Sequence, residues 1–146
     1  MGNSNYNIVI PILSKDFDKF SLNISAFRKY LPVKKFVLLG DDGLKEAISR
    51  LDCSDIIYIN ENSIVDAANI KDLMKSRIEG RDFGEKSPLS RFGWYYQQFL
   101  KLAYSYKCED EYYIVWDADT VPIRQYRPFD DAGIPFFDVK DEYHIP

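Results

Sequence analysis

Two aspartates one residue apart, Asp117 and Asp119, follow an apolar run and are the side chains best suited to chemistry. The run at 113–116 (Tyr-Ile-Val-Trp) is β-branched or aromatic throughout, which predicts a strand buried on both faces. Two carboxylates at its exit cannot both lie in the core, because isolated buried charges are costly. In an extended chain, side chains two residues apart point to the same side. We therefore expect both aspartates to converge on one hard cation, which prefers oxygen ligands.

Two kinds of chemistry fit this acid pair. In a DXD-type site, the carboxylates hold a divalent ion that neutralises a departing diphosphate. In haloacid-dehalogenase-like phosphatases, one aspartate attacks phosphorus and the other handles the proton. That motif normally follows the first strand and needs a lysine and acids far downstream, whereas only 27 residues follow Asp119. We rank the DXD site first, an ordinary solvated turn second, because Asp is common in turns, and the phosphatase third.

The segment before this strand, 91–106, has the apolar spacing of a helix. Trp94, Gln97, Gln98 and Lys101 recur on one side of it, at i, i+3, i+4 and i+7. An ordinary solvated face explains Lys101 and one glutamine, but explains the tryptophan and the glutamine pair less well. We predict that these four residues form a wall beside the acids and hold phosphate and sugar hydroxyls. The predicted inward face consists of Phe92, Tyr95, Tyr96, Phe99, Leu102, Ala103 and Tyr106.

Strand and helix patterns alternate along the chain, which predicts an α/β fold with a mostly parallel sheet flanked by helices. Ligands of such sheets bind at the carboxyl ends of the strands. Asp41 follows a predicted strand and is a candidate contact for a nucleoside base or ribose, although a helix cap is the favoured interpretation. Ser14 or Asp16 is expected to cap the first helix. Strands are expected at 7–13, 36–39, 56–59, 112–116, 120–124 and 134–139, and helices at 16–31, 41–51, 62–78 and 92–106.

Length and composition narrow the class of protein. The 146 residues predict a single domain, 1–146. A net charge of −4 gives no basic face for a nucleic acid, so no nucleic-acid partner is expected. No apolar run is long enough for a transmembrane segment, and neither such a segment nor a signal peptide is expected. Cys53 and Cys108 lie far apart and outside metal-type spacing, which favours two reduced thiols in a cytoplasmic protein.

The run 93–102 (Gly-Trp-Tyr-Tyr-Gln-Gln-Phe-Leu-Lys-Leu), followed by an apolar strand and by 117–120 (Asp-Ala-Asp-Thr), resembles a group of bacterial glycosyltransferase-like proteins. That group is found with polysaccharide genes and is assigned to the GT-A fold. Residues 8–11 (Ile-Val-Ile-Pro) are similar to its first strand, and 142–146 resemble a segment that continues further in relatives. The resemblance implies a GT-A-like (Rossmann-like) sheet of the nucleotide-diphospho-sugar transferase type.

The resemblance also implies an activity and its ligands. It implies glycosyl transfer from a nucleotide-diphosphate sugar, a UDP-sugar by preference, to a glycan acceptor of the bacterial surface, with Mn²⁺ or Mg²⁺ as cofactor. Asp119 would be the main metal ligand, and Asp117 would act through ribose or a metal-bound water. Gln97, Gln98 and Lys101 would position the donor. A peripheral location at the inner membrane face and a homo-oligomer are further expectations.

GT-A enzymes are usually longer, and their second half commonly supplies acceptor contacts and a base. We therefore expect 1–146 to be the nucleotide-binding half without the acceptor-binding part, and we assign no catalytic base. The alternative from another class is a non-catalytic nucleotide-binding or assembly module. Arg81, Lys86 and Arg91 are candidates to clamp a diphosphate, with ordinary surface charge equally favoured. His144, the only histidine, is expected to be a frayed solvent position.

Overall fold

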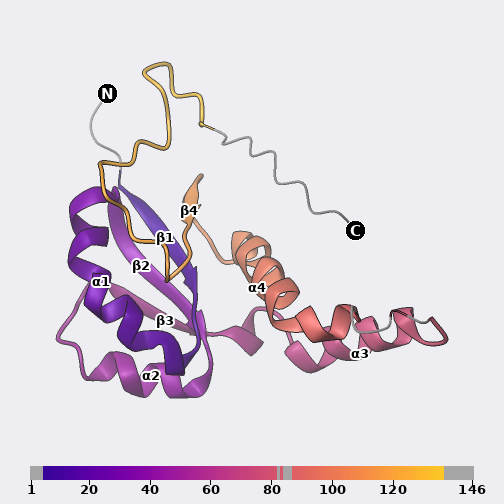
Figure 1. Cartoon of the computed structure of the whole chain (residues 1–146). Helices are drawn as coiled ribbons and strands as arrows, with labels where there is room; N and C mark the ends of the chain where they lie inside the picture. The colour runs from indigo at the N-terminus through magenta and orange to yellow at the C-terminus, as the bar shows by residue number, and fades with distance from the viewer. Residues whose placement is uncertain (1–4, 82, 84–86, 137–146) are drawn as a thin grey trace.

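The computed structural model describes residues 5–81, 83 and 87–136 and has an α/β architecture (Figure 1). Its sheet has four strands in the order β3-β2-β1-β4, and all neighbouring strands are parallel. This confirms the predicted fold class, a parallel sheet flanked by helices that is consistent with a Rossmann-like fold. The strands are β1 (Tyr6–Pro11), β2 (Val33–Gly40), β3 (Ile56–Asn60) and β4 (Tyr113–Val115).

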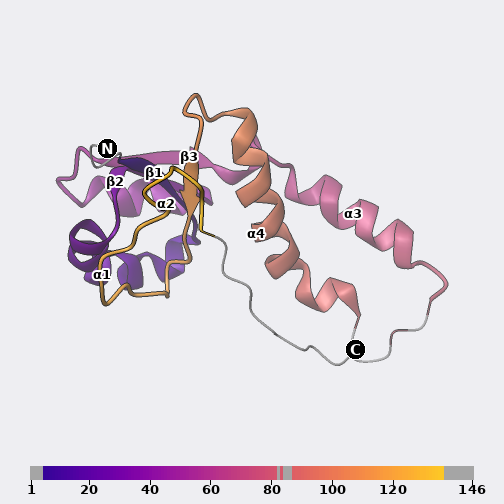
Figure 2. The same ribbon diagram turned by 90° about the horizontal axis from the view of Figure 1, so that it is seen from above.

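Helices cover both faces of the sheet (Figures 1 and 2). On one face lie α1 (Phe17–Tyr30) and α2 (Asp42–Ser49), and on the other lies α4 (Phe92–Ala103). The remaining helix, α3 (Ala67–Ile78), runs beside α4 away from the sheet and contains no buried residue (Figure 2). Short 3-10 turns flank these elements: η1 (Ser14–Asp16), η2 (Glu61–Ser63), η4 (Pro88–Arg91) and η5 (Tyr104–Tyr106).

The two central strands supply two cores because alternate residues of a strand point to opposite faces. Toward α1 and α2, the side chains of Ile8 and Phe36 pack with Phe20, which meets the Phe36 ring edge to face at a centroid distance of 5.5 Å. Toward α4, Val9 and other side chains of the opposite register pack with the aromatic residues of that helix. Continuous apolar sequence in β1 and β2 therefore reflects burial on both faces. The second core consists of Val9, Val37, Leu39, Tyr96, Leu100 and Tyr104.

The strand that precedes the acid pair is fully buried on only one face, so the prediction that it is buried on both faces is wrong. β4 pairs only with β1 among the described strands and has three residues. Ile114 is buried against the α1 side, but Val115, on the α4 side, is 39% exposed. The apolar run of the sequence extends beyond the strand to Trp116, which packs against the core on the α1 side. The run therefore looks like that of a central strand.

The segment after β4 is irregular rather than extended. The predicted strand at 120–124 is wrong, since no strand forms there. Instead, the Trp116 indole donates to the Thr120 carbonyl at 2.6 Å, and Tyr126 donates through its backbone to the Tyr30 carbonyl at 2.8 Å. The predicted strand at 134–139 contributes one antiparallel bridge, at Pro135, within the described residues, and its residues 137–139 lie outside them.

Helix starts differ from the predictions in two places. Neither Ser14 nor Asp16 caps α1 with its side chain, because η1 intervenes between β1 and that helix. The third helix begins at Ala67 rather than at Asn62, since Asp66 accepts hydrogen bonds from the first free backbone N–H groups. The following Gly80 has a φ of 74°, a left-handed conformation that ends the helical segment as expected.

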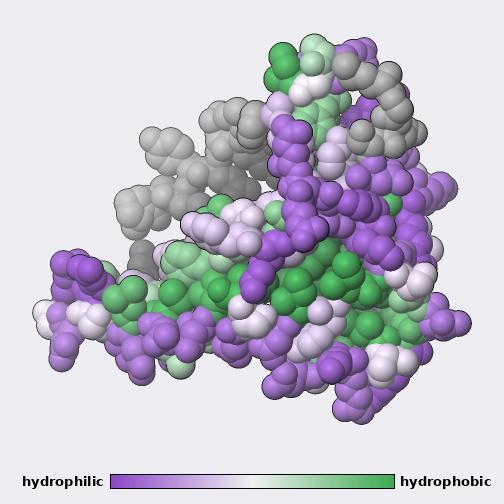
Figure 3. Space-filling view, turned by 180° about the vertical axis from the view of Figure 1, so that it is seen from behind, coloured by the Kyte–Doolittle hydropathy of each residue, from purple (hydrophilic) through white to green (hydrophobic). Residues whose placement is uncertain are grey.

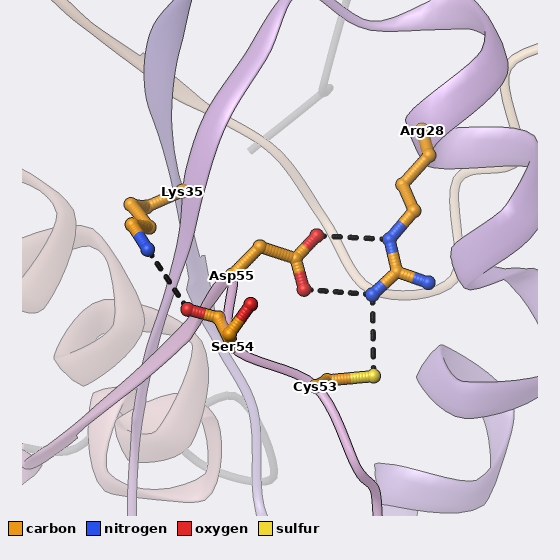
Figure 4. A network of polar contacts seen from close by, with 5 residues as sticks. All are labelled: Arg28, Lys35, Cys53, Ser54 and Asp55. Carbon is orange, nitrogen blue, oxygen red and sulfur yellow. Dashed lines mark hydrogen bonds and ion pairs between the residues drawn. The ribbon is translucent and has the colours of Figure 1, made fainter.

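A polar network ties α1 to the loop before β3, at the amino ends of the strands (Figure 4). Arg28 donates to both carboxylate oxygens of Asp55, at 2.8 and 2.7 Å, and to the Cys53 sulfur at 3.2 Å. Lys35 donates to the Ser54 carbonyl at 2.8 Å. The bidentate contact with Arg28 lowers the pKa of Asp55. Cys53 is not joined to Cys108 by a disulfide.

Within the described residues, the helices are too short or too polar for any of them to cross a lipid bilayer.

Candidate functional site

The candidate site lies where the order of the strands reverses direction. From β1 the chain proceeds to β2 and β3 on one side, and β4 then pairs with the opposite side of β1. The connections also change face, since α1 and α2 lie on one face of the sheet and α4 on the other. Such a switch point opens a crevice at the carboxyl ends of the strands, and ligands of open α/β sheets bind there. Asp117 follows β4 at this point.

Two residues predicted from the sequence are brought together here. The Lys101 ammonium donates to a carboxylate oxygen of Asp117 at 2.7 Å. The side chain of Lys101 is only 13% exposed, whereas that of Asp117 is 57% exposed. Tyr113 of β4 donates through its hydroxyl to the Lys101 carbonyl at 2.8 Å, which fixes this end of α4 against the strand. The ion pair therefore joins a largely shielded cation to an accessible carboxylate.

The two acids lie in a turn, so the extended-chain argument that led us to expect their convergence does not apply. The backbone N–H of Thr120 donates to the Asp117 carbonyl at 3.1 Å. Asp117 faces α4 through Lys101. Asp119 lies close enough to α1 for its charge to add, after the contact with Asp16, to the raised pKa of Lys19. Both carboxylates are exposed at the carboxyl edge of the sheet.

The side chains at this turn fit a divalent cation only if water or a bound phosphate supplies most of the coordinating oxygen atoms. Carboxylate oxygens suit Mg²⁺ and Mn²⁺. In the part of the chain that the structure describes, however, no three His, Cys, Asp or Glu side chains are grouped to hold an ion. Asp117 and Asp119 would leave the other coordination positions to water or to phosphate oxygens. A cation would also compete with the ammonium group of Lys101 for Asp117.

The Asp41 carboxylate caps α2 and also links that helix to η1. One of its carboxylate oxygens accepts from the Leu44 backbone N–H at 3.1 Å, at the start of α2. The other accepts from the Ser14 backbone N–H and hydroxyl, both at 3.1 Å. The favoured interpretation from the sequence, a cap, is confirmed, and Ser14 holds this carboxylate rather than capping α1. A donor nucleoside that contacted Asp41 would compete with Ser14 and Leu44 for the same carboxylate oxygens.

The other predicted donor-binding residues extend along α4 from Lys101. Gln97 and Gln98, one turn earlier, are half-buried, and the structure shows no hydrogen bond between their side chains and other described residues. Trp94 is 52% exposed and packs edge to face on Tyr95, with the Arg91 guanidinium 5.2 Å from its ring centroid. Trp94 lies near the start of α4 and Lys101 near its end, and the start of α4 points away from the sheet (Figure 2).

The predicted phase of α4 is wrong in part: Tyr96 is buried against the sheet as expected, but other residues of the predicted inward face are exposed. Tyr96, Leu100 and Tyr104, at i, i+4 and i+8, face the sheet. Phe99 is 41% exposed and Tyr106 is 92% exposed, although both were expected to face inward. The exposed side belongs to a shallow groove of about 420 Å³ between α3 and α4. Figure 3 shows a band of apolar side chains that runs from this end of the molecule toward the sheet.

Glu61 is a candidate that the sequence analysis missed. It follows β3 directly, so it also lies at the carboxyl edge of the sheet. Burial, and secondarily the charge of Asp41, raise its pKa. Its charge also contributes, after burial, to the raised pKa of Tyr96 on α4. The signal in the sequence was an acid immediately after an apolar strand, as at β4. Next to it, Asn60 donates to Asp42 at 2.6 Å.

Several candidates cannot be placed. Lys86 and His144 lie outside the described residues. Asp138, Asp141 and Glu142, the last acids of the chain, also lie outside them.

The fold and this edge define an α/β protein with a carboxylate–lysine pair at a switch point of a parallel sheet. The chain belongs to the family described as "Family of unknown function (DUF6492)", whose model matches residues 4–134. No curated protein and no solved structure matches it. The family match covers most of the chain and names no activity.

Proposed function

We propose that this chain is a metal-dependent glycosyltransferase, or its donor-binding half, that uses a nucleotide-diphosphate sugar for bacterial surface glycan synthesis. The observation that carries the proposal is the position of Asp117, accessible and held by Lys101, at the switch point of the parallel sheet. This is where open α/β sheets bind nucleotides. The resemblance of 93–102 and 117–120 to glycosyltransferase-like proteins adds the reaction class.

The charge of the edge explains why a cation would be needed. Asp41, Asp42, Glu61, Asp117 and Asp119 all follow strands at this edge. A diphosphate brought there would meet repulsion from these carboxylates. A divalent ion held by Asp119, with Asp117 acting through ribose or a metal-bound water, would reverse the local field and neutralise charge on the departing diphosphate.

The α4 residues would orient the donor. Lys101 can offer its ammonium group to phosphate, and the side chains of Gln97 and Gln98 can donate to phosphate or sugar hydroxyls. Trp94, exposed near the start of the helix, offers an aromatic face for a sugar or base. Donor binding by these residues supplies positioning rather than a base.

Calorimetry with Mn²⁺, with and without UDP, tests the proposal. The chain should bind Mn²⁺ weakly alone and more tightly when UDP is present, and UDP affinity should disappear in EDTA. In Asp119→Ala, UDP should no longer strengthen Mn²⁺ binding. Gln98→Ala should keep the melting temperature of the parent but bind UDP about 5- to 30-fold more weakly. This loss corresponds to ~1–2 kcal/mol for a hydrogen bond to a charged group. Unchanged Mn²⁺ affinity in Asp119→Ala would disprove the metal assignment.

A non-catalytic nucleotide-binding module is the second candidate, and one observation favours it. The first acids after the motif, Asp130 and Asp131, lie in a turn. There the Asp130 carboxylate accepts from the backbone N–H groups of Ala132 and Ile134, at 2.9 and 2.8 Å, so it stabilises the turn rather than serving as a base. Donor binding without hydrolysis or transfer by the purified chain would support the module, and metal-dependent transfer would support the enzyme.

A further inference from the structure

The ammonium group of Lys101 contacts Asp117, one of the two carboxylates proposed to serve a divalent cation. Its nitrogen lies 2.7 Å from a carboxylate oxygen, and its side chain is largely shielded from solvent. The backbone at Lys101 is anchored to β4 by the Tyr113 hydroxyl. In the described part of the chain this is the only ion pair of Asp117, whereas no ion pair of Asp119 forms among the described residues, and Lys19, whose pKa Asp119 helps to raise, is paired with Asp16 at 2.7 Å.

We propose that Lys101 is a built-in counter-ion that is exchanged when the donor binds. In the free protein Lys101 neutralises Asp117 and hinders metal binding there. When a nucleoside diphosphate arrives, the ammonium group moves to a phosphate oxygen and Asp117 becomes available to the divalent ion. This inference rests on the proposed function, because it assigns a regulatory role to a residue of the same site.

The exchange couples metal and diphosphate binding without a large conformational change. A lysine side chain is a flexible stem with three rotatable donors, so its head can move between a carboxylate and a phosphate while the helix stays in place. Each ligand then removes an obstacle for the other: the diphosphate removes the ammonium group from Asp117, and the metal prevents its return. By linkage, the metal strengthens diphosphate binding by the same factor as the diphosphate strengthens metal binding.

Three variants of the full chain separate the role of the Lys101 charge from that of its aliphatic side chain. Lys101→Met keeps most of the stem and removes the charge, and Lys101→Arg keeps the charge. Lys107→Met removes an exposed lysine beyond η5 and serves as the matched control. The measurements are the Mn²⁺ dissociation constant with and without UDP by calorimetry, and the melting temperature as a check of folding.

With Mn²⁺ alone, we expect Lys101→Met to bind about tenfold more tightly than the parent, because the metal no longer competes with an ammonium group. Lys101→Arg and Lys107→Met should bind like the parent. UDP should strengthen Mn²⁺ binding severalfold in the parent and much less in Lys101→Met.

Equal or weaker Mn²⁺ affinity in folded Lys101→Met, measured without nucleotide, would overturn the exchange whatever UDP does. Tighter Mn²⁺ binding in Lys101→Met together with no response to UDP in the parent would retain the displacement of Lys101 by metal. That result would disprove diphosphate as the trigger, and with it the proposed donor. The two failures are therefore distinguishable in one set of titrations.

Discussion

At the scale of single residues, the carboxyl edge contains acids with different tasks. Asp41 is enclosed by donors from two other elements, Asp117 is paired with a lysine, and Glu61 has its pKa raised by burial. A carboxylate whose oxygens already accept hydrogen bonds contributes mainly to stability. An accessible carboxylate with one cationic partner is better suited to exchange that partner for a ligand. The local contacts therefore favour Asp117 over Asp41 as a binding residue.

Replacing Asp41 with Ala should lower the free energy of unfolding by about 1–2 kcal/mol, because the α2 cap and the bonds to Ser14 are lost. Asp42→Ala is the matched control, since Asp42 accepts only from Asn60 among the described residues and should cost less. Urea unfolding measures both. An Asp41→Ala variant as stable as the parent, with weakened UDP binding, would show that Asp41 serves the ligand rather than the fold.

The raised pKa of Glu61 predicts how stability depends on pH. The folded protein holds the Glu61 proton more tightly than the unfolded chain, whose value is near the ordinary 4.5. Stability is therefore lost as pH rises from about that value through the folded pKa. Glu61→Gln should match the parent near pH 4 and become more stable than the parent by pH 7. Urea unfolding at both pH values tests this, and a parent that gains on the variant as pH rises would contradict it.

The sequence predicted that Lys101 lies on the side of α4 beside the aspartates, but not that Lys101 pairs with Asp117. Helical spacing placed Lys101 on the side of α4 that also carries Gln97 and Gln98. The contact depends on where β4 ends and how the chain turns after it, and both are set by packing of Trp116 against the first core. Local sequence patterns do not contain that tertiary information.

At the scale of elements, β1 and β2 were predictable and the phase of α4 was not. Central parallel strands read as unbroken apolar runs because both faces are covered. The sequence of α4 is apolar on nearly every side, so spacing alone allows several inward faces. Packing against Val9, Val37 and Leu39 selects Leu100 and leaves Phe99 half-exposed.

Neighbouring alanine substitutions in α4 test its phase. Leu100→Ala should cost ~2–5 kcal/mol of unfolding free energy, because its side chain is fully buried against the sheet. Phe99→Ala should cost less, roughly 1–2 kcal/mol, because much of its ring already contacts water. Thermal and urea unfolding of the two variants measure the difference. A larger loss in Phe99→Ala than in Leu100→Ala would restore the face predicted from the sequence.

At the scale of the whole molecule, stability is concentrated around the two central strands. Both cores use β1 and β2, and α1 contributes Phe17, Phe20 and Phe27 to one of them. In contrast, α3 contains no buried residue and packs on α4 away from the sheet. Elements with few buried apolar contacts open locally at low free-energy cost. We therefore expect the sheet with α1 to form the most stable unit and α3 to open independently of it.

Amide hydrogen exchange measures this distribution. Amides of β1, β2 and α1 should exchange slowest, because they are exposed to solvent only when the whole protein unfolds. Those of α3 should exchange much faster. Ile10→Val, a substitution in the first core, should accelerate the slow amides and leave those of α3 nearly unchanged, because local opening does not require the core to unfold. Ala68→Gly, on the exposed surface of α3, is the matched control. It should accelerate only α3, because glycine weakens a helix by about 1 kcal/mol. Equal protection of α3 and α1 would show that α3 is part of the stable unit and that contacts outside the described sheet core hold it in place.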